Sequence, residues 1–66
     1  MEFKDKVLFV RAKLNMTQTE LAKALGVAYI TVNRWENGNV QPTKKAQLIF
    51  EMFCQEKGII VEEEGI

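Results

Sequence analysis

The stretch Thr17–Glu36, TQTELAKALGVAYITVNRWE, constrains the fold of this chain more than any other segment. It holds two short apolar patterns at helical spacing, separated by a single glycine, Gly26. Thr17 and Glu20 form a capping-box signature, in which two side chains satisfy N–H groups at the start of a helix. Glycine readily takes the left-handed conformation that ends helices. We therefore expect one helix to end at Gly26 and a second to run over about residues 28–37.

Two further helices are expected on either side of this pair. Apolar residues share one face over about residues 2–14, where they fall at Phe3, Val7, Val10 and Leu14. Asn15 is expected to end that helix. Thr43 follows Pro42 and is expected to cap a last helix that runs to about residue 57, with Leu48, Ile49, Met52 and Phe53 facing inward. The sequence thus predicts an all-α fold, a compact four-helix bundle followed by a short extended C-terminal tail.

Composition excludes several classes of protein. A chain of 66 residues forms at most one domain. Its one cysteine, Cys54, reads as a small buried hydrophobe, and without histidine no zinc site or nucleophile–base pair can be assembled. No apolar run approaches the roughly 20 residues that span a bilayer. We expect a cytoplasmic protein that is not an enzyme and uses no metal or cofactor.

The charge is divided unevenly although the net charge is zero. Residues 1–50 carry eight basic and four acidic side chains, whereas residues 51–66 carry one and five. Contacts with phosphate are local, so a basic body is compatible with nucleic acid despite the neutral total. We divide the chain into a body, residues 1–58, and an acidic tail, residues 59–66.

Two short helices joined by a glycine-containing turn make a helix-turn-helix, whose second helix can project into the major groove of DNA. The stretch TQTELAKALGVAYITVNRWENGNVQP resembles the phage-repressor-type, or xenobiotic-response-element (XRE), family of such domains. The shared pattern comprises Thr-Gln, Glu-Leu-Ala, Gly-Val, Trp-Glu-Asn-Gly and a proline, and the resemblance extends over about residues 6–57.

The resemblance implies roles for individual residues. Bases would be read from the outward side of the second helix, by Tyr29, Ile30, Asn33 and Arg34. Backbone phosphates would be held around that helix by Gln18, Ala28, Thr31, Asn37, Thr43 and Lys44. Arg11 and Glu36 would form a partly buried salt bridge between helices, although Arg11 as a phosphate contact remains an alternative.

The departures from the family pattern leave two functions open. Ala28 stands where the family usually has Ser or Thr, and apolar Tyr29 and Ile30 replace more usual polar residues. We expect a sequence-specific DNA-binding transcriptional regulator, a repressor acting on double-stranded DNA as a homodimer. Its dimer surface would be formed by residues 59–61 with Phe50 or Phe53. The alternative is an antitoxin-like accessory module that binds a protein partner.

Overall fold

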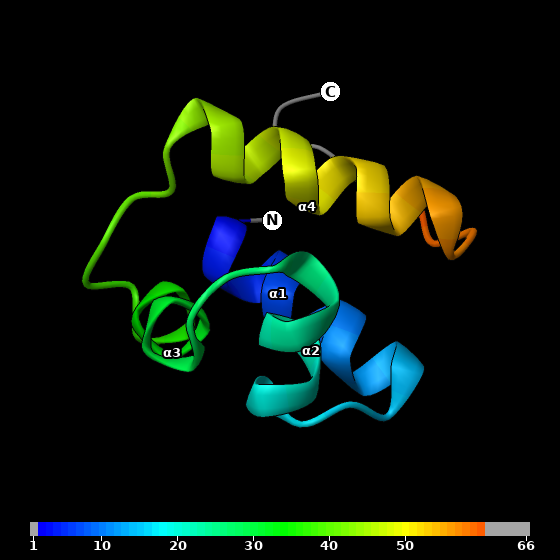
Figure 1. The fold of residues 1–66 in the computed structure, drawn as a ribbon, viewed down its shortest axis with the longest axis horizontal. Helices are drawn as coiled ribbons and strands as arrows, with labels where there is room; N and C mark the ends of the chain where they lie inside the picture. Colours follow the sequence, from blue (N-terminus) through cyan, green and yellow to red (C-terminus); the bar gives the residue numbers. More distant parts are fainter. Residues whose placement is uncertain (1, 61–66) are drawn as a thin grey trace.

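The computed structural model describes residues 2–60 of the chain. Within them it contains four α-helices and no strand, which confirms the predicted all-α fold. The helices are α1 (Phe3–Leu14), α2 (Gln18–Leu25), α3 (Tyr29–Asn37) and α4 (Lys44–Glu56). In Figure 1, α2 lies in front of α1, α3 is seen nearly along its axis, and α4 crosses the top of the molecule.

Local capping signals set the helix ends. The Thr17 hydroxyl accepts from the Glu20 N–H and the Glu20 carboxylate accepts from the Thr17 N–H, so the predicted capping box is present. Asn15 and Gly26 end α1 and α2 in the left-handed conformation, at φ 55° and 76°. Thr43 caps α4 by accepting from the Ala46 N–H. The expected ends were therefore accurate to within a residue or two.

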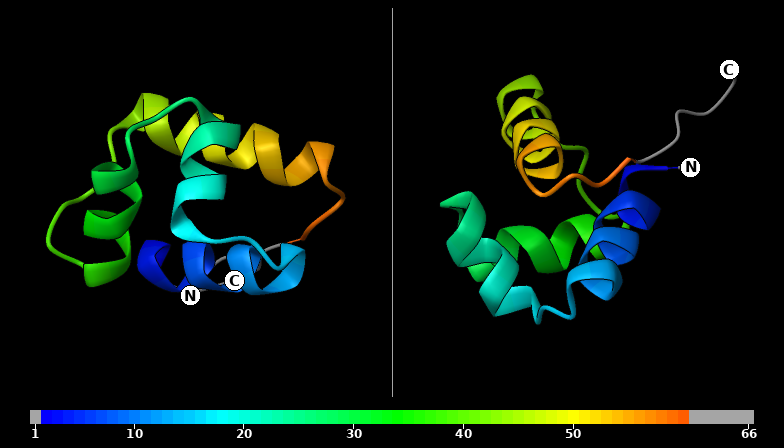
Figure 2. Two further views of the ribbon diagram at one scale, coloured as in Figure 1. Left: turned by 60° about the horizontal axis from the view of Figure 1, so that its bottom comes forward. Right: turned by 90° about the vertical axis from the view of Figure 1, so that its right-hand side faces the viewer.

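The core is formed by the facing sides of all four helices. Its fully or almost fully buried side chains come from α1, α2, α3 and α4, and they are Val7, Val10, Leu21, Ala22, Leu25, Val32, Trp35, Phe50, Phe53 and Cys54. The side view in Figure 2 shows α4 lying on one side of the other three helices. Phe3 meets the rings of Trp35 and Phe50 edge-on, each with its centroid 5.2 Å away, and so joins α1, α3 and α4.

The inward face of α4 differs from the prediction. Phe53 is buried as expected and Ile49 is half-buried, but Leu48 and Met52 are 56% and 59% exposed. Phe50 and Cys54 take the inward positions instead. Residues two apart on a helix lie on nearly opposite sides, so a face centred on Phe50 and Cys54 turns Leu48 and Met52 to solvent.

The same burial corrects the expected dimer surface. Phe50 and Phe53 are only 2% and 7% exposed, so neither can form a surface for a second copy. After Gly58, Ile59 packs against the core and its N–H donates to the Cys54 carbonyl at 2.9 Å. Ile60 is 86% exposed. The extended tail was predicted for residues 59–66, and the structure forms no strand at residues 59 and 60. The rest of that tail, residues 61–66 with the three glutamates, lies outside the described residues. No helix in residues 2–60 is long and apolar enough to cross a membrane.

Candidate nucleic-acid interface

The turn between α2 and α3 fixes the relative direction of the two helices. Gly26 has φ 76°, and the next residue, Val27, donates its N–H to the Ala22 carbonyl at 3.0 Å. Ala28 then occupies the N-cap of α3 in an extended conformation with no side-chain hydrogen bond. Ala22 is 2% exposed and belongs to the core, and α2 and α3 pack against each other. The sequence therefore builds two helices joined by a tight three-residue turn.

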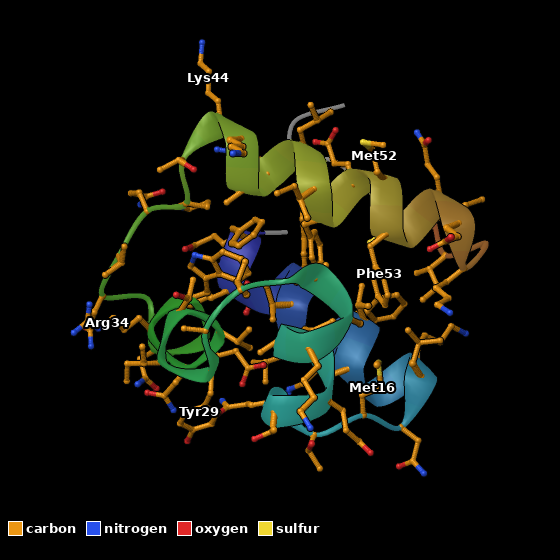
Figure 3. The ribbon with its side chains drawn as sticks, in the orientation of Figure 1. Met16, Tyr29, Arg34, Lys44, Met52 and Phe53 are labelled. Carbon is orange, nitrogen blue, oxygen red and sulfur yellow. The ribbon has the colours of Figure 1, made fainter. Side chains whose placement is uncertain are left out.

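The two sides of α3 differ in chemistry. Val32 and Trp35 point into the core and are 0% and 3% exposed. Ile30 lies on the opposite side and is 47% exposed, and Tyr29, at the first position of the helix, is 50% exposed. Arg34 is exposed and projects from α3 away from the molecule in Figure 3. Three of the four residues expected to read bases are thus exposed on a helix whose inner side is buried through Val32 and Trp35.

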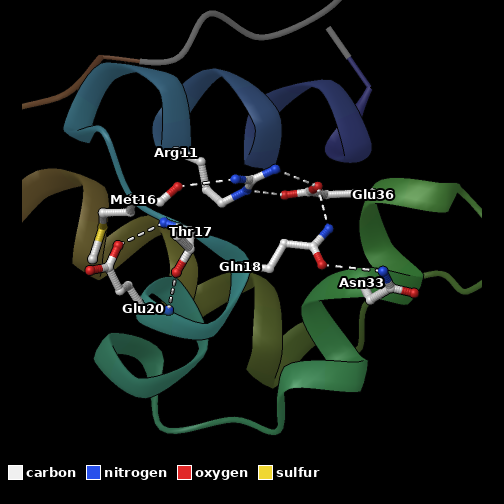
Figure 4. A network of polar contacts seen from close by, with 7 residues as sticks. All are labelled: Arg11, Met16, Thr17, Gln18, Glu20, Asn33 and Glu36. Carbon is white, nitrogen blue, oxygen red and sulfur yellow. Dashed lines mark hydrogen bonds and ion pairs between the residues drawn. The ribbon is translucent and has the colours of Figure 1, made fainter.

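Arg11 and Glu36 form a two-pronged ion pair between α1 and α3. Arg11 Nε donates to Glu36 Oε2 at 2.6 Å, and Arg11 Nη2 donates to Oε1 at 2.9 Å. Arg11 Nη1 also donates to the Met16 carbonyl at 3.0 Å, in the loop before α2 (Figure 4). The Glu36 side chain is 6% exposed and that of Arg11 is 23% exposed. One guanidinium therefore ties α1, the α1–α2 loop and α3 together.

The surroundings of Arg11 and Glu36 favour the charged form of each side chain. Burial acts to raise the pKa of the Glu36 carboxyl, but hydrogen bonds from Arg11 and Gln18 and the charge of Arg11 outweigh it. The pKa of Glu36 therefore lies below its ordinary value. The hydrogen bond to Glu36 likewise raises the pKa of Arg11. Two of the three hydrogen bonds of Arg11 therefore belong to the salt bridge that was expected for it, and the third goes to the Met16 carbonyl.

The structure reveals a chain of side-chain amides that starts at this ion pair. Gln18 Nε2 donates to Glu36 Oε1 at 2.7 Å, and Gln18 Oε1 accepts from Asn33 Nδ2 at 3.2 Å. Asn33 Oδ1 in turn accepts from Asn37 Nδ2 at 3.1 Å. Sequence reasoning missed these contacts between α2 and α3. Their partners are 15 and 18 residues apart, and only the packing of the helices brings them together.

The remaining residues expected to hold phosphates lie on α3 and at the starts of α2 and α4. Thr31 is half-buried, and Asn37 is exposed at the end of α3. Thr43 and Lys44 open α4, and in Figure 3 the Lys44 side chain points outward from its first turn. The N-terminal turn of α2, with Gln18, lies beside α3 through the contact with Asn33. The contact of each with phosphate stays a prediction.

Two other features of residues 2–60 bear on metal binding and on the reactivity of the cysteine. Among residues 2–60 no three acidic, histidine or cysteine side chains could together hold a metal ion. A cavity of about 350 Å³ lies between α1 and α4, with Lys6, Cys54 and Ile59 in its lining. Burial, and then the charge of Glu51, raise the pKa of the Cys54 thiol, which keeps it in its unreactive neutral form.

The arrangement of α2, the turn and α3 on a small helical body defines a helix-turn-helix domain. A helix-turn-helix family profile matches residues 9–46, more than half of the chain, so the chain belongs to this family. The match confirms the resemblance to the XRE-type group that the sequence indicated.

A curated relative is the HTH-type transcriptional regulator DicA of Escherichia coli (strain K12), which is 39% identical over 41 residues. The alignment covers 62% of this chain but 30% of DicA, so the chain spans less than a third of that relative's length. No solved structure gives a significant match.

Proposed function

We propose that this protein is a DNA-binding transcriptional regulator that inserts α3 into the major groove. The observation that carries the proposal is the outer side of α3, where Tyr29, Ile30 and Arg34 project from a helix held by Val32 and Trp35. The major groove, about 12 Å wide, admits one α-helix and displays a distinct pattern of donors and acceptors for each base pair. A rigid helix with an exposed reading side suits that groove.

The side chains support sequence-specific binding. A guanidinium pairs with guanine O6 and N7 through two hydrogen bonds, and Arg34 has no ion-pair partner within residues 2–60 that would compete with such a contact. Apolar side chains contact the thymine methyl group, which suits Tyr29 and Ile30. Phosphates on either side of the groove would be held by the first turn of α2, by Asn37, and by Thr43 and Lys44 at the start of α4.

We further propose that the protein acts as a repressor and as a homodimer on a two-fold operator. One small DNA-binding module buries only about 600–1,000 Å² on DNA. Two copies on half-sites about one helical turn apart double that contact and raise specificity. The name of DicA as a transcriptional regulator supports a role in transcription.

The exposed apolar pair Tyr29 and Ile30 favours a second candidate, an antitoxin-like accessory module. Each keeps about half of its surface open, at 50% and 47%. Protein interfaces are enriched in aromatic side chains, so the same face could contact a protein partner instead of DNA. In that case Tyr29→Ala would abolish binding and Arg34→Ala would not.

Selection of bound duplexes from random DNA tests the two candidates. Wild type, Arg34→Ala and the control Lys57→Ala are compared, since Lys57 is an exposed basic residue after the far end of α4. A regulator enriches a two-fold motif with wild type and Lys57→Ala, and Arg34→Ala loses the motif. If wild type enriches no motif at low salt, the proposal of a DNA-binding regulator is wrong.

A further inference from the structure

The hydrogen bonds that link the side-chain amides of Gln18, Asn33 and Asn37 to Glu36 can run in only one direction. The Glu36 carboxylate is already paired with Arg11 and can only accept hydrogen bonds, so Gln18 must turn its NH₂ group toward it. The Gln18 oxygen then faces Asn33, which must present its own NH₂ group. The Asn33 oxygen is left to accept from Asn37. Every donor in the chain thus points toward the buried carboxylate.

Reversing any one amide would break this order. A flipped Gln18 would place its oxygen against the Glu36 carboxylate at 2.7 Å and its NH₂ group against the NH₂ group of Asn33. Two acceptors would then face each other at one contact and two donors at the other. Hydrogen bonds to a charged group are roughly twice as strong as neutral ones, so the contact with Glu36 determines the orientation of the whole chain.

The orientation leaves Asn33 with a defined hydrogen-bonding capacity. Its NH₂ group has two hydrogens, of which Gln18 takes one. Its oxygen has two lone pairs, of which Asn37 takes one. One donor and one acceptor therefore remain on a half-buried amide of the helix that bears Arg34. Asparagine pairs with adenine through one donor to N7 and one acceptor from N6.

We infer that Asn33 reads an adenine in the major groove and that Gln18 is a positioning residue, which sets the direction of the Asn33 amide through Glu36. The inference rests on the proposed function, because it names one base contact within that site. It also gives Gln18 a different role from the phosphate contact that the family resemblance implies. A phosphate contact acts on all sequences alike, whereas positioning of Asn33 acts on one base pair.

The test uses that difference. The preferred duplex of wild type is first obtained by selection, and a panel is then made in which each base pair is replaced in turn. Affinities for the panel are measured for wild type, Gln18→Leu, Asn33→Ala and the control Gln55→Leu. Gln55 is an exposed glutamine near the end of α4, so this control makes the same chemical change away from α3.

We expect wild type and Gln55→Leu to prefer adenine by about tenfold or more at one position of each half-site. Gln18→Leu and Asn33→Ala should both reduce that preference to less than about threefold and leave the preferences at other positions unchanged. A Gln18→Leu protein that retains the full adenine preference would overturn the inference, even if its affinity for every duplex fell. If wild type itself shows no preference anywhere, the proposed function fails and the adenine contact with it.

A second measurement needs no DNA. The side-chain NH₂ resonances of Asn33 are followed by NMR in the wild type, in Gln18→Leu and in Gln18→Met, which keeps the length of the side chain. Loss of the acceptor should speed hydrogen exchange of the Asn33 NH₂ group by about tenfold, since it opens the amide to water. Exchange unchanged in both folded variants would show that Gln18 does not position Asn33.

Discussion

Glu36 lies against Arg11 with both of its carboxylate oxygens engaged, at 2.6 Å from Nε and 2.9 Å from Nη2. This pair joins α1 to α3, two helices that are separated in sequence by the whole of α2. Because the Glu36 carboxylate is 6% exposed, its charge depends on Arg11 and Gln18 for the solvation that water would otherwise supply. The orientation of the proposed reading helix is therefore coupled to an ion pair.

Removing one partner of this pair should destabilise the fold more than removing both. Arg11→Met leaves a nearly buried carboxylate unpaired, and we expect it to lower the free energy of unfolding by about 2–4 kcal/mol, given partial exposure of the arginine. Glu36→Gln should have a smaller effect, because a neutral amide remains. A double-mutant cycle in urea measures the coupling. A coupling energy below about 0.5 kcal/mol would show that the pair behaves as an ordinary surface salt bridge.

The same carboxylate should make stability depend on pH. The pKa of Glu36 in the folded protein lies below its ordinary value of 4.5, so the unfolded chain binds the proton more tightly. The stabilisation is therefore complete above that ordinary value and is lost as the pH falls through the lower folded pKa. We expect wild type to lose more unfolding free energy than Glu36→Gln between about pH 6 and about pH 3. Equal losses in urea titrations of the two proteins would contradict this assignment.

The features that could be predicted from the sequence are those set by neighbouring residues. The capping box at Thr17 and Glu20 and the helix ends at Asn15 and Gly26 depend on backbone groups within about one turn. The inner residues of α2 were also predictable, because Leu21, Ala22 and Leu25 fall on one side of that helix. Local chemistry thus sufficed for the helix-turn-helix and for its family.

The features that could not be predicted depend on how helices pack. The segment of α4 from Leu48 to Cys54 is apolar at every position except Glu51, so periodicity alone could not select the buried side. The buried side is the one that carries Phe50 and Phe53, and Phe50 packs there against Phe3 of α1. The contacts of Gln18 with Glu36 and Asn33 likewise join separate helices, and no spacing rule along one helix predicts them.

The N-cap residues of α3 and α4 differ in chemistry, so opposite substitutions at the two positions can be compared. Ala28 caps α3 without a side-chain hydrogen bond, whereas Thr43 caps α4 by accepting from the Ala46 N–H. Ala28→Ser should supply the missing acceptor and raise the free energy of unfolding by about 1 kcal/mol, and Thr43→Ala should lower it by about the same amount. Thermal unfolding checks both. A lower midpoint for Ala28→Ser would show that the position rejects a hydroxyl.

The two sides of α4 should respond differently to substitution. Phe53 is buried, so Phe53→Ala should cost about 3–5 kcal/mol through the lost packing and the cavity left behind. Met52 is exposed by 59%, and Met52→Gln should change stability by less than about 0.5 kcal/mol. Urea unfolding of the two variants measures the difference. A large loss in Met52→Gln would mean that the inward face of α4 is the one that the sequence pattern first indicated.

The salt dependence of DNA binding should separate Lys44 from Arg34. If Lys44 contacts a phosphate, Lys44→Ala should weaken binding to all duplexes and reduce the slope of log affinity against log salt concentration by about 0.9. If Arg34 pairs with a guanine, Arg34→Ala should instead remove the preference at one base pair, worth about 1–3 kcal/mol. Fluorescence anisotropy on the preferred duplex and on a scrambled one, over a range of salt concentrations, distinguishes the two effects. Lys57→Ala is the control and should leave both slope and preference unchanged. If Lys44→Ala keeps the wild-type slope, Lys44 at the start of α4 does not contact a phosphate. The phosphate contacts would then have to come from α3 and from the first turn of α2.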